Sequence, residues 1–165
     1  RRARLGAVGP PSEWLVASVP SAEAVAAAWG PTLMDVPIDE VIEALREADL
    51  AETAAVRAVI EGGAEAVREP ASADLAAASR VVVALRDVVR RHRLDACAVR
   101  CFDLVVGPGT TGCLALSWLL DEGIVAGCEG DVPATLTMLW LQLLTGESSF
   151  MANPQDVDTA TNTMH

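Results

Sequence analysis

Apolar and polar residues form blocks along this chain whose lengths predict alternating strands and helices. Short apolar runs bounded by Gly or Pro are typical of buried parallel strands, whereas longer runs with apolar residues three or four positions apart are typical of helices. By these criteria we predict strands at 5–9, 32–36, 96–102, 124–128 and 149–153. We predict helices at 22–29, 40–48, 52–61, 113–120 and 132–144, and a long helix that begins at Ser72 or Asp74 and reaches about His92.

Residues with known preferences mark the helix ends. Ser21 is a good N-cap, and Gly30 followed by proline is typical of a helix end. Asp39 and Asp131 are expected to cap the helices that follow them. The polar, Thr-rich stretch 154–164 has no predicted element.

Strands that alternate with helices predict an α/β fold: an open parallel sheet with right-handed crossovers and helices on both faces. This is the Rossmann-like or flavodoxin-like three-layer sandwich. At 165 residues the chain has the length of one domain, so residues 1–165 are expected to form a single α/β domain.

The net charge of the chain limits the classes of molecule that it can be expected to bind. A formal net charge of −11 argues against nucleic acid, whose binding needs a basic surface, and is compatible with a metal cation or a neutral polyol. The longest apolar stretch, 132–144, is shorter than the ~20 residues of a membrane span. The cysteines contain no CxxC pair, so we predict buried, reduced thiols in a cytoplasmic protein; they are Cys97, Cys101, Cys113 and Cys128.

The stretch 123–133 carries the candidate chemistry. It predicts a buried strand, a turn with Glu129 and Asp131, and a helix start at Val132. Ligands of open α/β sheets bind at the carboxyl ends of strands, where these two acids lie. Asp131 could cap the helix, bind a ligand, or do both, and Glu129 could instead be a solvated turn residue.

Two neighbouring segments could complete a site. Asp103 ends the preceding predicted strand and could be a third oxygen donor for Mg²⁺ or Mn²⁺, or a solvated loop acid. The loop 107–112 could hold an anion on free N–H groups, but it is no P-loop, and a tight turn is favoured. Trp14 is a candidate for the edge of a binding site, whereas the other tryptophans are expected in the core; they are Trp29, Trp118 and Trp140.

Several short motifs resemble the middle of the L-fucose isomerase-like family, which includes L-fucose and L-arabinose isomerases. The resemblance spans nearly all 165 residues. Its most specific part is Gly127-Cys128-Glu129-Gly130-Asp131-Val132-Pro133-Ala134. The other matching segments are Pro11-Ser12-Glu13-Trp14-Leu15, Arg100-Cys101-Phe102, Thr111-Gly112-Cys113 and Leu143-Leu144-Thr145-Gly146.

The resemblance implies an aldose–ketose isomerase that uses Mn²⁺ and acts on a small sugar, usually as a homo-oligomer of three-domain subunits. Its chemistry moves a proton between C1 and C2 through an enediol, with a carboxylate as acid or base and a metal on two sugar oxygens. It implies that Asp131 binds the metal with Glu129 beside it, and that Ser12 and Trp14 lie near the sugar.

The sequence also departs from this family. Gly112 stands where the better-known fucose isomerases have a catalytic Glu, for which Asp103 is a candidate substitute. The family's histidine ligand comes from a C-terminal domain, and neither that domain nor the N-terminal one is expected in this chain; His165 cannot be assigned to the ligand. We therefore expect little or no isomerase activity from these 165 residues alone. The alternative is a non-catalytic carbohydrate-binding or assembly module of the same fold.

Overall fold

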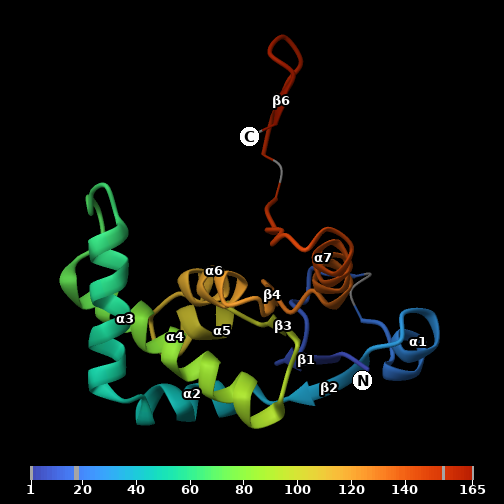
Figure 1. The fold of residues 1–165 in the computed structure, drawn as a ribbon, viewed down its shortest axis with the longest axis horizontal. Coiled ribbons are helices and arrows are strands. Elements are labelled where there is room, and N and C mark those ends of the chain that lie inside the picture. Colours follow the sequence, from blue (N-terminus) through green and yellow to red (C-terminus); the bar gives the residue numbers. More distant parts are fainter. Residues whose placement is uncertain (1, 17–18, 154, 165) are drawn as a thin grey trace.

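A four-stranded parallel sheet is the centre of the computed structural model, which describes residues 2–16, 19–153 and 155–164 (Figure 1). Its strand order is β2-β1-β3-β4. The strands are β1 (Arg4–Val8), β2 (Thr32–Val36), β3 (Ala96–Val99) and β4 (Val125–Gly127). All three strand pairs are parallel, which confirms the predicted α/β class.

Helices cover both faces of this sheet. They are α1 (Ala22–Ala28), α2 (Ile38–Glu47), α3 (Leu50–Gly63), α4 (Ser72–His92), α5 (Phe102–Val106), α6 (Cys113–Asp121) and α7 (Val132–Thr145). Because side chains alternate along a strand, Leu5 and Val125 pack with α1 and α7, while Val8 and Val99 pack on the opposite side with α2, α4 and α6. The result is the expected three-layer sandwich.

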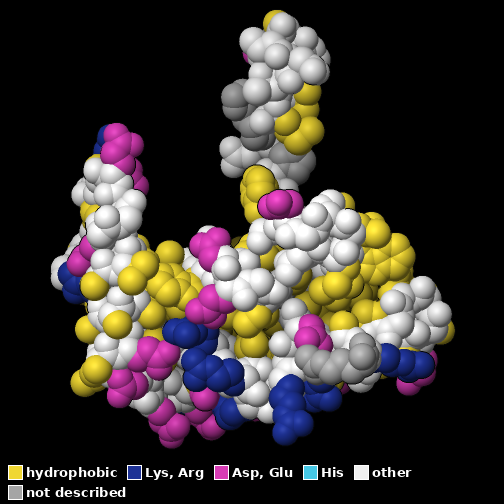
Figure 2. Space-filling view, viewed as in Figure 1, with side chains coloured by type: hydrophobic (Ala, Val, Ile, Leu, Met, Phe, Trp, Pro, Cys, Tyr) yellow, Lys and Arg dark blue, Asp and Glu magenta, His cyan; other side chains and the backbone are white. Residues whose placement is uncertain are grey.

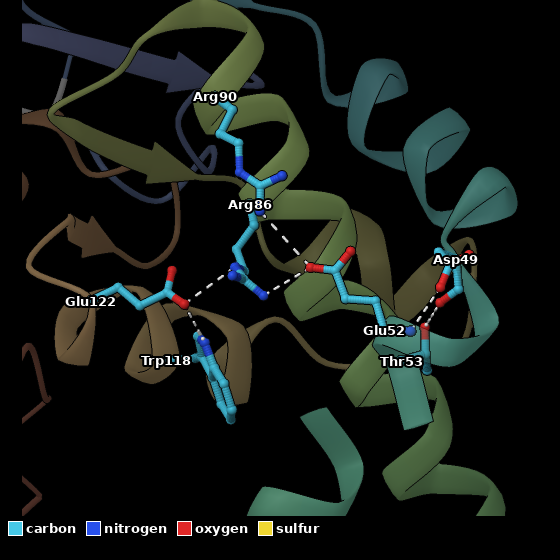
Figure 3. Close-up of polar contacts among 7 residues, drawn as sticks. All are labelled: Asp49, Glu52, Thr53, Arg86, Arg90, Trp118 and Glu122. Carbon is cyan, nitrogen blue, oxygen red and sulfur yellow. Dashed lines mark hydrogen bonds and ion pairs between the residues drawn. The ribbon is translucent and has the colours of Figure 1, made fainter. Parts of the chain in front are cut away.

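Helix α4 is the most deeply buried helix segment of the core. Val81, Val82 and Leu85 are fully buried, and α2, α3 and α6 all contact α4. Polar contacts hold the same helices: Arg86 of α4 lies between Glu52 of α3 and Glu122, at 2.9 and 3.2 Å (Figure 3). Trp118 of α6 donates to Glu122 at 2.8 Å. This network fixes α6, whose C-terminal end leads into β4.

Three sequence expectations are corrected. The strand predicted at 96–102 ends at Val99, because the chain turns there and residues 102–106 form α5. The strand predicted at 149–153 is wrong: Phe150 is exposed and does not join the sheet. Helix α2 begins at Ile38, so Asp39 lies in its first turn and does not cap it.

The stretch after residue 154, for which the sequence predicts no element, contains a small hairpin. Strand β5 (Val157–Asp158) pairs antiparallel with β6 (Thr163–Met164). The hairpin extends away from the main sheet in Figure 1. Asp158 accepts hydrogen bonds from the backbone N–H groups of Ala160 and Thr161, which form the turn between the two strands.

Two tryptophans expected in the core are at the surface. Trp29 and Trp140 make an edge contact with ring centroids 4.5 Å apart, and they are 49% and 41% exposed. Figure 2 shows hydrophobic side chains gathered over α7 and towards α1. Trp118 is half-buried in the network of Figure 3. Among the described residues, no helix is both long enough and apolar enough to pass through a lipid bilayer.

Candidate functional site

The carboxyl edge of the sheet brings three loops together: the loop after β1, the start of the β3–α5 turn and the β4–α7 turn. The β4–α7 turn is fixed to both neighbours by backbone hydrogen bonds. Gly130 donates to the Val99 carbonyl at 3.0 Å, and Ser12 donates to the Glu129 carbonyl at 3.0 Å. Glu129 itself has a left-handed backbone, with φ of 61°. These bonds set the position from which the Glu129 side chain leaves the turn.

The Glu129 carboxylate is held by an aromatic side chain from the β1 loop. Trp14 donates its indole N–H to Glu129 Oε2 at 2.6 Å, and Asn153 lies 3.5 Å from Oε1. Trp14 also makes an edge contact with Phe102, with ring centroids 5.1 Å apart. Trp14 is 54% exposed, so this aromatic edge and the carboxylate beside it face solvent.

Asp131 caps α7, as the sequence predicts. Its Oδ1 accepts the backbone N–H of Ala134 at 2.9 Å, and Thr135 donates to the Asp131 carbonyl at 2.7 Å. Within the described part of the chain, no hydrogen bond reaches the second oxygen, Oδ2. One oxygen therefore has a structural task, and the other is available to a ligand.

Two substitutions of Asp131 test how much its helix cap contributes to stability. We expect Asp131→Ala to lower the free energy of unfolding by about 1 kcal/mol, because the cap is lost. Asp131→Asn should cost less than about 0.5 kcal/mol, because an asparagine oxygen accepts the same N–H. Urea unfolding measures both. Equal losses in the two variants would show that the Ala134 hydrogen bond is not what Asp131 contributes to stability.

Asp103 is an ion-pair partner of Arg100. Arg100 donates from Nε to Asp103 at 2.8 Å, from Nη1 to the Pro11 carbonyl at 2.8 Å and from Nη2 to Glu13 at 2.8 Å. The hydrogen bonds that Arg100 donates to Asp103 and Glu13 raise the pKa of Arg100, and Arg100 in turn lowers the pKa of Glu13. Arg100 thus anchors the β1 loop to the end of β3, and Asp103 is one of the groups that orient it.

Ser12 is buried beneath this loop. Only 2% of it is exposed, and its hydroxyl oxygen has no hydrogen-bonding partner among the described residues. The Ser12 hydroxyl is therefore closed off from solvent in this structure. Its backbone N–H, which donates to Glu129, makes the contact that joins the two loops.

The loop 107–112 is a turn that closes onto α5. Gly107 donates to the Asp103 carbonyl at 3.0 Å, and Thr110 donates to the Leu104 carbonyl at 3.0 Å. A Cβ atom at Gly112 would lie 3.3 Å from the Cβ of Cys101, so this backbone packs tightly against the end of β3. The geometry agrees with the tight turn that the sequence favoured.

The cysteines do not all have the expected buried environment. Cys97 and Cys101 are buried, Cys128 is half-buried and Cys113 is exposed. Burial raises the pKa of Cys97 to about 12. The Sγ atoms of Cys101 and Cys128 lie 2.8 Å apart, and this hydrogen bond lowers the pKa of Cys101 and raises that of Cys128.

Sequence reasoning missed two of these features. The sequence treats Arg100 only as part of a motif, although an arginine within an otherwise apolar predicted strand, 96–102, needs anionic or carbonyl partners, and that need is a usable signal. The contact between Cys101 and Cys128 had no signal in the spacing, because the cysteines lie 27 positions apart, in the segments that follow β3 and β4.

The structure brings few candidate ligands together for the metal ion that the sequence analysis expects. Across residues 2–16, 19–153 and 155–164, no three His, Cys, Asp or Glu side chains gather in an arrangement that could hold a metal ion. His165 lies outside the described residues. Glu129 and Asp131 remain as two carboxylates on one turn.

Comparison with known proteins finds similarity to two sugar isomerases. The chain is 35% identical over 86 residues to a sulfoquinovose isomerase of Clostridium sp. (strain MSTE9), covering 52% of this chain and 19% of that protein. It is 30% identical over 83 residues to a sulfoquinovose isomerase of Alkalicoccus urumqiensis, covering 49% of this chain and 19% of that protein. The matched segment thus spans about a fifth of each relative. No family model matches the chain.

Proposed function

We propose that this chain contributes metal-binding carboxylates to a divalent-metal-dependent aldose–ketose isomerase of the L-fucose isomerase-like family. The observation that carries the proposal is the turn after β4, where Asp131 offers a free carboxylate oxygen beside Glu129 at the carboxyl edge of the sheet. The similarity to two sulfoquinovose isomerases supports a sugar as the substrate. Sulfoquinovose is therefore the first sugar to test, followed by L-fucose and L-arabinose.

The donor set suits Mn²⁺ or Mg²⁺ in chemical type, since both prefer oxygen ligands. Asp131 would bind through Oδ2, and Glu129 would be the second carboxylate. Two carboxylates leave most of an octahedral site to sugar hydroxyls, water and residues outside those described here. Such a metal would stabilise the negative charge that develops on the sugar oxygens during proton transfer.

The chain's own residues would orient the sugar and handle its proton. Trp14 holds Glu129 through the indole N–H, which fixes the direction of that carboxylate. Glu129 is thereby our candidate for the acid or base that moves the proton between C1 and C2. The exposed rings of Trp14 and Phe102 would line the sugar's apolar edge. Asp103, paired with Arg100, would keep the β1 loop in place.

Titration calorimetry with Mn²⁺ tests the proposal. We expect Asp131→Asn to weaken Mn²⁺ binding by at least about tenfold while the protein stays folded. Asp121→Asn is the matched control, because Asp121 is an exposed acid at the end of α6, before β4 begins. Equal affinity of Asp131→Asn and the unaltered chain, or no Mn²⁺ binding by the unaltered chain, would contradict the proposal.

A sugar assay adds a second readout. With Mn²⁺ and each of the three sugars, the 165-residue chain is expected to form little or no ketose, because among the described residues no third metal-binding side chain joins Glu129 and Asp131. Turnover comparable to that of a whole isomerase would contradict this expectation. The homo-oligomeric state, the cytoplasmic location and the absence of a nucleic-acid or membrane partner also belong to the proposal; light scattering tests the first.

A non-catalytic carbohydrate-binding module is the second candidate. It is favoured by the exposed edge pair of Trp14 and Phe102, since aromatic rings of this kind offer an apolar surface next to polar groups. Calorimetry separates the two candidates. Sugar binding that is unchanged by EDTA and by Asp131→Asn would favour the module over the isomerase.

A further inference from the structure

Two cysteines that follow adjacent strands are in contact at the carboxyl edge. Cys101 follows β3 and Cys128 follows β4, and their Sγ atoms lie 2.8 Å apart. A disulfide bond is about 2.05 Å long, so the two sulfurs need to approach by less than about 1 Å. Neighbouring parallel strands that end side by side give this proximity without any rearrangement of the sheet.

We propose that Cys101 and Cys128 are a modification site: a dithiol that a peroxide oxidises to a reversible disulfide bond, which joins the ends of β3 and β4 directly before Glu129. The proposal does not depend on the isomerase function. It rests on the contact between the two sulfurs, on the access of an oxidant to one of them and on the position of the other two cysteines.

Access to the pair is from the Cys128 side. Cys101 is only 6% exposed, whereas Cys128 is half-buried and lines an open cleft of about 390 Å³ together with Cys113, Phe150 and Met151. A peroxide molecule is small enough to enter this cleft. The cleft therefore opens the pair to the oxidant at Cys128, and Cys101 is packed directly behind it.

The reaction balances with one peroxide for each protein chain. One sulfur of the pair attacks one peroxide oxygen, the O–O bond breaks, and the products are a sulfenic acid and one water. The other sulfur then attacks the sulfenic sulfur, the S–O bond breaks, and a second water leaves. Both thiol protons end on the two waters, the two sulfurs lose two electrons, and the peroxide gains them. A thiol reductant reverses the bond.

The other two cysteines differ in whether they could compete for this bond. Cys97 is fully buried in the core on the α4 side of the sheet. Cys113 is exposed at the start of α6, and it faces the same cleft as Cys128. Cys113 is therefore the one alternative partner that the experiment has to distinguish.

Peptide mapping after oxidation is the test. The protein is treated with equimolar hydrogen peroxide, blocked with iodoacetamide, and cleaved with trypsin and with a protease that cuts before aspartate. These cuts, after Arg100 and before Asp103 and Asp121, place Cys101, Cys113 and Cys128 on three different peptides. We expect the 101–102 and 121–130 peptides to be linked, and the free thiols to fall from four to two.

Cysteine-to-serine variants identify which two thiols form the disulfide bond. Cys113→Ser should form the same linked peptide, whereas Cys101→Ser and Cys128→Ser should each keep their three thiols unlinked after the same treatment. In the unaltered protein the bond should raise the Tm by roughly 5–10 °C, and dithiothreitol should reverse that rise. A link from Cys128 to Cys113, a sulfinic acid in place of a link, or retention of four free thiols in the unaltered protein would overturn the proposal.

Discussion

Gly130→Ala is expected to lower the free energy of unfolding by about 2–4 kcal/mol and to separate the β1 loop from the turn that carries Glu129. Gly130 has φ of 70°, a conformation that L side chains rarely adopt. A Cβ atom there would lie 2.9 Å from the Pro10 carbonyl oxygen and 2.9 Å from the Pro11 Cα. Both are backbone atoms, so no side chain can rotate away to make room.

Gly123→Ala is the matched control for this prediction. Gly123 has φ of 80°, but a Cβ atom there would meet nothing within 4 Å. Its substitution should therefore cost only the strain of the left-handed backbone, about 1–2 kcal/mol. Urea unfolding of the two variants isolates the clash with the β1 loop. If Gly130→Ala is no less stable than Gly123→Ala, the close approach of the two loops is contradicted.

Gly127→Ala is the second substitution with a large expected effect, about 3 kcal/mol of lost stability. Gly127 is the last residue of β4, where α7 crosses the sheet. An added Cβ atom would overlap Thr135 Oγ1 and lie 3.1 Å from Thr135 Cβ. Thr135 is fully buried in α7 and donates to the Asp131 carbonyl, so it cannot move without moving the helix. Urea unfolding measures the loss.

A double-mutant cycle checks the cause of this loss. Thr135→Ala removes the atom that the new Cβ would overlap, so Gly127→Ala should cost at least about 1 kcal/mol less in the Thr135→Ala background. Gly62→Ala is the control for the alanine itself, since Gly62 lies near the end of α3 with open space around it. Its effect should be neutral or slightly stabilising. Additive effects of the first two substitutions would show that α7 does not press on Gly127.

The fold follows from local patterns that the sequence displays directly. The long helix predicted to begin at Ser72 or Asp74 and to reach about His92 is α4, Ser72–His92, and the strand predicted at 32–36 is β2, Thr32–Val36. Both are runs whose apolar period matches one element type over its full length. The predicted boundaries are wrong where a local turn ends the element. Nothing in the sequence 96–102 marks the end of β3 at Val99.

The candidate site was predictable in its position but not in its contacts. Glu129 and Asp131 were found because a buried strand followed by acids and a helix start is a local pattern. Asp131 as the cap of α7 is equally local, since the cap and the Ala134 N–H that donates to it lie three positions apart. The hydrogen bond from Trp14 to Glu129 joins residues 115 positions apart, and the pattern carries no information about it.

By itself, then, the sequence determined the α/β class, most helices and strands, and the turn on which the candidate carboxylates lie. Hydrophobic period and capping preferences act between residues that are close in the chain, so both can be recognised in the sequence. The tertiary structure decided that Arg100 holds Asp103 and Glu13, that Cys101 meets Cys128, and that Gly130 supports the β1 loop. Those contacts depend on the strand order β2-β1-β3-β4 and its register, which only the packing of the whole sheet fixes.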